Sequence, residues 1–195
     1  MSSAEVRNTP IGQLIFSYLT EDTKDTKYDP NGIFHCTLRL KKLEAEPEIA
    51  AIQEVIKKTI AAAHMQKKGL PQIGSSQPLK RASLPYEIDP EDGSVLIKFK
   101  SKFKPALYDG TRQELSPDVS IYKGSTARIK YKLSGYNQSV GIGCVLHLLA
   151  VQVANLVETN ETKECPFGEI TTAAPRIKLN QPIESVLPAP EKMVF

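Results

Sequence analysis

At 195 residues the chain is long enough for one domain with short extensions, since domains usually hold roughly 100–200 residues. Its hydrophobic fraction of 41% and charged fraction of 24% are typical of a globular protein and exclude disorder throughout. No run approaches the ~20 apolar residues of a transmembrane helix, and residues 1–10 contain no apolar signal-peptide core. An intracellular protein is therefore expected.

The three cysteines, Cys36, Cys144 and Cys165, are too few and too scattered for a disulfide framework, and their odd number indicates a reducing compartment. Cys36 and Cys144 lie in apolar runs, which predicts buried thiols. The three histidines share no metal-ligand spacing with the cysteines. We expect no metal and no cofactor.

Two strands are predicted in the first part of the chain. Residues 11–20 are apolar, β-branched and aromatic, and they precede a polar segment with a turn signal at residues 30–32. Residues 32–41 then alternate apolar side chains such as Phe34 and Cys36 with polar ones such as His35 and Thr37. This period of two is typical of a half-buried strand.

Residues 47–68 change to a period of three to four and predict the one helix. Ile49, Ile52 and Ile60 recur at helical spacing, and Pro47 suits a first turn. Glu48 comes early and four lysines come late, as the helix dipole favours. Gly69 ends the helix, and an irregular loop is expected up to Pro85.

The middle of the chain holds two strands with cations on one face. In the first, Val95, Ile97, Phe99 and Phe103 alternate with Lys98, Lys100, Lys102 and Lys104. In the second, Ala127, Ile129, Tyr131 and Leu133 alternate with Arg128, Lys130 and Lys132. Phe99 and Tyr131 are in phase with the apolar positions and are expected in the core.

A short strand at residues 119–123 and a long closing strand within residues 139–157, bent at Gly141 and Gly143, complete the pattern. After residue 157 several prolines and no periodicity predict a loosely ordered C-terminal tail. The fold class is therefore mainly β, a five- to six-stranded antiparallel barrel of the OB type with one inserted helix. Residues 1–157 form the domain and residues 158–195 the extension.

The basic strands point to a polyanionic ligand. Residues 95–133 hold nine lysines and arginines against three acidic residues, a local excess of six. If the two strands are neighbours in the sheet, their cations form one patch that binds phosphates by releasing counterions, independently of base sequence. Aromatic rings near glycines in loops and at strand ends add base stacking, which single-strand binding requires. The candidate DNA-binding residues are Lys98, Lys100, Lys102, Lys104, Arg128, Lys130, Lys132, Tyr108, Tyr122 and Tyr136.

The same basic residues also allow a purely structural interpretation. Alternating lysines also protect exposed strands against edge-to-edge aggregation, and a charged outer face is common in antiparallel sheets. Two strands with almost no acidic residues favour the binding interpretation, because solvent-exposed faces ordinarily carry both positive and negative charges. No phosphate-binding loop, nucleophile elbow or paired carboxylates are present, so no enzyme is expected.

Several segments together resemble a known family. Residues 127–133, followed by Tyr136-Asn137 and Val140-Gly141, are similar to a signature of the single-stranded DNA-binding proteins of short-tailed bacteriophages, which encode their own replisome. Residues 32–38 before the helix, residues 84–86 after it, the strand at residues 97–103 and the closing strand to Val157 follow in the family's order. The resemblance covers residues 11–157.

The resemblance implies an OB fold, a role in phage DNA replication, recombination and annealing, and a location in the cytoplasm of the infected bacterial host. It also implies a C-terminal tail that contacts a polymerase or helicase, here through Phe195, and that competes with DNA by its negative charge. The last twelve residues hold only Glu184 and Glu191 against Lys192, which argues against strong competition. The sequence does not decide between a monomer and a homodimer.

Two alternatives to single-stranded DNA binding remain. The barrel could be a docking platform in a structural or assembly protein whose lysines only keep it soluble. It could also bind RNA, since the sequence does not reveal a response to 2′-hydroxyl groups.

Overall fold

The computed structural model describes residues 5–27, 29–68, 80–116 and 119–157. The predicted C-terminal extension, including Cys165 and Phe195, lies outside them. The described elements are eight strands and one helix: β1 (Glu5–Asn8), β2 (Gly12–Tyr18), β3 (Phe34–Leu40), α1 (Lys42–Lys68), β4 (Tyr86–Ile88), β5 (Val95–Ser101), β6 (Ala106–Tyr108), β7 (Thr126–Gln138) and β8 (Gly141–Asn155).

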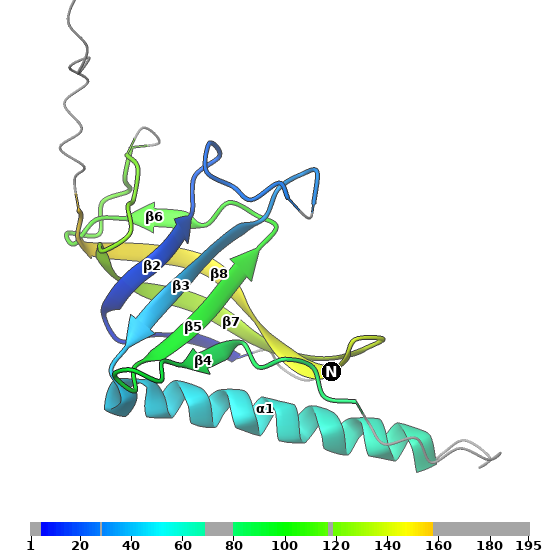
Figure 1. Cartoon of the computed structure of the whole chain (residues 1–195). Helices are drawn as coiled ribbons and strands as arrows, with labels where there is room; N and C mark the ends of the chain where they lie inside the picture. Colours follow the sequence, from blue (N-terminus) through cyan, green and yellow to red (C-terminus); the bar gives the residue numbers. More distant parts are fainter. Residues whose placement is uncertain (1–4, 28, 69–79, 117–118, 158–195) are drawn as a thin grey trace, which may run out of the picture. The chain divides into compact units, whose positions relative to one another are not determined.

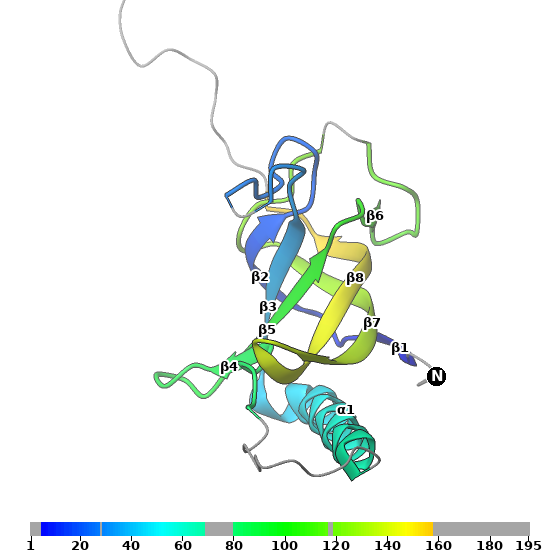
Figure 2. The ribbon, with the colours of Figure 1, turned by 90° about the vertical axis from the view of Figure 1, so that its right-hand side faces the viewer.

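Five strands pair in a circuit that returns to its start. β7 pairs with β2, β2 with β3, β3 with β5, β5 with β8, and β8 again with β7. The short strands β1, β4 and β6 add to β7, β5 and β8 respectively. Figures 1 and 2 show the strands curving around a common interior. The mainly β fold of OB type with one inserted helix is thus confirmed.

Two pairings differ from the predicted antiparallel arrangement. β8 runs parallel to β5 and to β6, and each parallel pair is joined by a long connection that includes β7. The five strands of the circuit match the five main predicted strands. Residues 119–123 do not form the predicted short strand: Ser125 N–H bonds the Tyr122 carbonyl in a turn, and Ile121 packs into the core.

Alternation along the strands fills the interior. Leu38 of β3, Ile97 of β5, Ile129 of β7 and Leu146 of β8 are each at most 1% exposed. Phe99 and Tyr131 meet edge to face with ring centroids 5.2 Å apart, which confirms both as core residues. Phe103 is 83% exposed instead of buried, because β5 ends at Ser101 and the alternation ends with it.

Helix α1 begins at Lys42, five residues before the predicted start, so Pro47 lies one turn inside the helix rather than at its first turn. The helix starts directly after β3, where Ala45 N–H already bonds the Lys41 carbonyl. It packs on β7 and β8 and lies across the end of the sheet near β4 (Figure 1). Ala45 and Ile52 on its inner face are fully buried.

A buried polar cluster links α1 to the sheet. Glu48 of α1 is 3% exposed and accepts hydrogen bonds from the Tyr131 hydroxyl of β7 and, at 3.3 Å, from Nε of Arg7 in β1. Burial and the bond to Glu48 raise the pKa of Tyr131, so its hydroxyl stays a neutral donor. The carboxylate is therefore partnered from two strands, as a buried charge requires.

We expect Tyr131→Phe to lower the free energy of unfolding by about 1–3 kcal/mol, because Glu48 loses one of its donors in a buried site. Urea unfolding measures the change. Lys58→Ala is the control: it breaks an exposed pair with Glu54, and such pairs contribute about 0–1 kcal/mol. A loss for Tyr131→Phe no larger than that of the control would contradict a stabilising role for the cluster.

Candidate nucleic-acid interface

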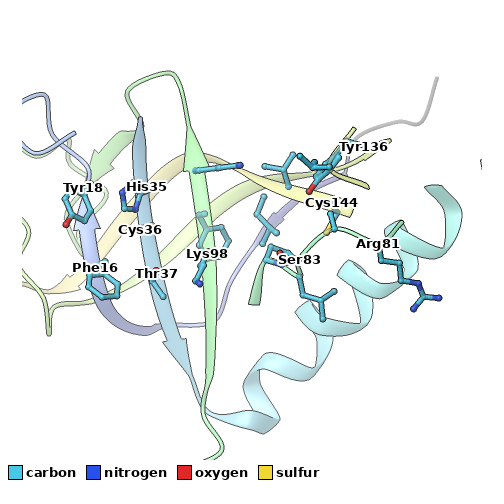
Figure 3. Close-up of a pocket in the computed structure, with 18 of the residues that line it drawn as sticks. Phe16, Tyr18, His35, Cys36, Thr37, Arg81, Ser83, Lys98, Tyr136 and Cys144 are labelled. Carbon is cyan, nitrogen blue, oxygen red and sulfur yellow. The ribbon is translucent and has the colours of Figure 1, made fainter. Parts of the chain in front are cut away.

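A groove of about 800 Å³ opens on the outer face of β2, β3 and β5 (Figure 3). On its other side it is bounded by the segment of residues 80–85, which we call the strap, and by β8 with the end of β7. The lining residues are Phe16, Tyr18, His35, Cys36, Thr37, residues 80–85, Lys98, Phe99, Lys100, Tyr136, Val140, Cys144, Val145 and Leu146.

Exposed aromatic rings line one side of this groove. Phe16 is 53% and Tyr18 37% exposed. The Tyr18 ring stacks on the His35 ring with centroids 4.3 Å apart, and His35 Nε2 lies 3.4 Å from a carboxylate oxygen of Asp25. In Figure 3 these rings stand on the β2 and β3 side, with Tyr136 on the opposite side. Aromatic rings thus line both walls of the groove.

A β-bulge in β2 turns these rings outward. Leu14 pairs with Leu38 and Phe16 pairs with Thr37, so two residues of β2 oppose one residue of β3. The extra residue reverses the alternation, and Leu14 points into the core whereas Phe16 and Tyr18 point away from it. The prediction of a plain strand over residues 11–20 therefore missed both aromatic residues as site residues.

The strap is held at both ends. Ala82 N–H bonds the Ile142 carbonyl at 2.9 Å, and Ile142 N–H bonds the Lys80 carbonyl at 2.8 Å. At its other end Pro85 accepts from Lys98 N–H of β5 at 2.9 Å. Lys80 and Arg81 are exposed and line the groove. They are two cations outside the set of DNA-binding residues predicted from the sequence.

Two glycines of β8 make room for the strap. Gly141 has φ +125°, and a Cβ there would lie 2.8 Å from both Ala82 N and the Lys80 carbonyl oxygen. A Cβ on Gly143 would lie 2.8 Å from the Tyr136 hydroxyl and 3.0 Å from Ala82 Cβ. Tyr136, which the sequence predicts as a base-stacking residue at a strand end, therefore rests over Gly143 at the groove wall.

The groove also contains two buried thiols. Cys36 and Cys144 are 1% and 4% exposed, as predicted from their apolar surroundings. Burial raises the pKa of Cys36, and it raises the pKa of Cys144 to about 11. Both thiols stay protonated near neutral pH and belong to the apolar floor of the groove.

The lysines of β5 differ in their surroundings. Lys98 Nζ lies 2.5 Å from Glu87 of β4, whereas Lys100 is exposed and forms no ion pair with another described residue. Lys102, past the end of β5, lies 3.3 Å from Asp29. Lys104 lies beside a separate hollow with Leu107 and Glu114. Within the groove, Lys100 and the two strap cations are thus the positive charges that form no ion pair with any other residue that the structure describes.

The prediction that the two basic strands are neighbours is wrong, because β8 lies between β5 and β7. Arg128 and Lys130 of β7 line a hollow of about 210 Å³ with Tyr108 and Gln152, apart from the groove. Lys132 is exposed next to β8. Tyr122 is 42% exposed and lines neither the groove nor this hollow. Only Lys98, Lys100 and Tyr136 of the predicted residues meet in the groove.

Comparison with solved structures identifies similar folds. The single-stranded DNA-binding protein gp2.5 of bacteriophage T7 matches with a TM-score of 0.66 and 21% identity, over 83% of this chain and 98% of that chain. The single-stranded DNA-binding protein of bacteriophage Enc34, in complex with single-stranded DNA, matches with a TM-score of 0.57 and 18% identity, over 78% of this chain and 88% of that chain. The chain shares the fold of phage single-stranded DNA-binding proteins. No family model and no curated protein sequence matches it.

Among the described residues, no group of three or more His, Cys, Asp or Glu side chains is arranged to hold a metal ion. No helix in this part of the chain is long and apolar enough to cross a membrane.

We expect Gly141→Ala to release the strap, because the added Cβ overlaps its backbone and φ +125° disfavours any L side chain. The amide protons of Ala82 and Ile142 should exchange with solvent at least ~10-fold faster, as hydrogen–deuterium exchange by NMR would measure. Gly93→Ala is the matched control, since Gly93 also has positive φ, +70°, but open space around its Cβ position. Equal exchange in both variants would contradict the assignment.

Proposed function

We propose that this protein binds single-stranded DNA without sequence preference during phage DNA replication, recombination and annealing, and that the groove is its binding site. One observation carries the proposal: aromatic rings, and cations that form no ion pair with other described residues, share a groove on the outer face of β2, β3 and β5. In chain order β3 and β5 are the second and third strands of the circuit. OB folds bind oligonucleotides on this face and through the adjoining loops. The DNA-bound Enc34 protein, of similar fold, supports the same ligand class.

The rings account for a preference for unpaired bases. Phe16, Tyr18 and Tyr136 present faces on which bases stack, and each stacked base contributes about 1–3 kcal/mol. A duplex hides its base faces within its own stack, so it cannot use them. Because every base has a π-face, this contact does not select sequence.

The cations account for phosphate binding. Lys100, Lys80 and Arg81 line the same groove as the rings, and each phosphate they neutralise releases counterions. Lys98 contributes less in the free protein because Glu87 holds its ammonium group. The asymmetry predicts that Lys100, rather than Lys98, is the more important phosphate contact on β5.

The wider role follows from the ligand. A protein that coats exposed strands acts without catalysis, in the cytoplasm of the infected host, and it needs no cofactor. Contact of the C-terminal tail with a polymerase or helicase through Phe195 stays a prediction. A homodimer also stays a prediction. Lys102, Lys104 and Tyr122, placed outside the groove lining, are not part of the proposed binding surface.

We expect Tyr136→Ala to weaken binding to a fluorescently labelled oligothymidine by roughly 5- to 150-fold, the loss of one stacked base at about 1–3 kcal/mol. Fluorescence anisotropy at fixed salt measures the dissociation constant. Tyr122→Ala removes an exposed tyrosine outside the groove and is the matched control. If the two variants bind alike, the groove is not where bases stack.

We also expect the logarithm of the binding constant to fall linearly with the logarithm of salt concentration, and Lys100→Ala to reduce that slope by about 0.7. Competition with RNA and duplex DNA of equal length separates the alternatives. Wild-type protein that binds no nucleic acid at low salt would overturn the proposal in favour of a protein-docking platform.

A further inference from the structure

A row of basic side chains continues from the groove across the outer face of three strands. We call it the outer track, and it consists of Lys100 on β5, His147 on β8, and Lys132, Lys130 and Arg128 on β7. Lys100 also lines the groove, so the outer track and the groove share one residue. The track ends at the hollow that Arg128 and Lys130 form with Tyr108.

Strand register brings these side chains together. Lys100 pairs with His147 in the parallel β5–β8 pair, and His147 pairs with Lys132 in the antiparallel β8–β7 pair. Residues in direct register project from the same face of a sheet, and strands lie about 4.8 Å apart. Lys100 and Lys132 are thus separated by two strand spacings, with the His147 ring between them. Lys130 and Arg128 follow on the same face of β7.

The outer track has no carboxylate partner in the part of the chain that the structure describes. None of its five side chains forms an ion pair with any residue in the described ranges. All five are exposed, and Arg128 Nε donates to the neutral amide oxygen of Gln152 at 2.8 Å, which holds its guanidinium at the surface. An uncompensated cationic row repels itself and favours a polyanion as ligand.

We propose that a bound single strand leaves the groove at Lys100, crosses β8 at His147 and continues along β7, so that nucleotides beyond the groove bind through their phosphates. The inference rests on the proposed function and deepens it, because it names the path of the strand. Among the described residues, no exposed aromatic ring other than His147 belongs to the outer track before the half-buried Tyr108, so the contacts in between are to phosphate and add affinity with length rather than base preference.

His147 makes this path sensitive to pH. Partial burial of the ring and the charges of Lys132 and Lys100 lower its pKa, so the ring is neutral in the free protein near neutral pH. These two lysines are the charged groups that face it from β7 and β5. A phosphate placed between them supplies the opposite charge and favours the imidazolium. Binding of a long strand therefore takes up a proton, and affinity rises as pH falls.

The first test compares two oligothymidines, about 5 nucleotides for the groove alone and about 12 for groove and outer track, by calorimetry at low salt. The double variant Lys130→Ala/Lys132→Ala should bind the short strand as wild type does. It should bind the long strand at least ~10-fold more weakly, with a salt slope reduced by about 1.4 for two lost phosphate contacts. Lys42→Ala/Lys57→Ala, on α1, removes the same charge elsewhere and should leave both unchanged.

The outcomes separate the two proposals. If wild-type protein binds neither length, the proposed function fails. If wild type binds both lengths and the double variant matches the α1 control with each, or weakens both lengths equally, the outer track is overturned while the groove stands.

The second test measures proton uptake at pH 7 from calorimetry in buffers of different ionisation enthalpy. Wild type should take up more protons with the long strand than with the short one, and His147→Gln should abolish that difference. The groove, where His35 lies, is occupied by both strand lengths and is the same in both proteins, so the comparison isolates His147. Uptake that persists unchanged in His147→Gln would rule out the path across β8.

Discussion

The contact between β5 and β8 is the constraint on which the rest of the structure depends. It joins the groove strands β2, β3 and β5 to the long β7–β8 hairpin, and it does so through a parallel pairing with Lys100 opposite His147. The strap is bonded to β8 at one end and to β5 at the other. Without the β5–β8 contact, the distance between these two attachment points would not be fixed. The groove and the outer track would then not be held next to each other.

The backbone of β8 is adapted to this junction at a cost. Gly141 and Gly143 lack side chains where the strap and Tyr136 approach most closely, and glycine in a strand weakens it by losing more entropy on folding. The hydrophobic pattern resumes immediately, with Cys144, Leu146 and Leu148 all buried. The packing of the following residues can offset the loss, so the same strand both closes the core and leaves space for a binding wall.

Local sequence patterns predict the elements well and the site only in part. The alternation of Val95, Ile97 and Phe99, and of Ala127, Ile129 and Tyr131, identifies both strands and their inner faces, because burial imposes a period of two. Which strands become neighbours depends on contacts between distant residues, and here β8 separates the two basic rows. The bulge at residues 14–16 is equally invisible in composition, yet it decides that Phe16 faces outward. A single extra residue thus changes a core aromatic into a candidate binding residue.

The placement of charge follows from the same geometry. Carboxylates accompany two of the other basic side chains, Glu87 with Lys98 in the middle of β5 and Asp29 with Lys102 just past its end, and they lower the local repulsion there. Between Lys100 and Lys132 the structure instead places a neutral imidazole, which separates the two ammonium groups without cancelling them. Like charges placed side by side across strands disfavour folding. A histidine with a lowered pKa limits this repulsion in the free protein, and it can add a third charge when a polyanion is present. Charge repulsion within the outer track is therefore smallest when no ligand is bound, and its positive charge is largest when a polyanion is bound. Reversible phosphate binding requires this combination.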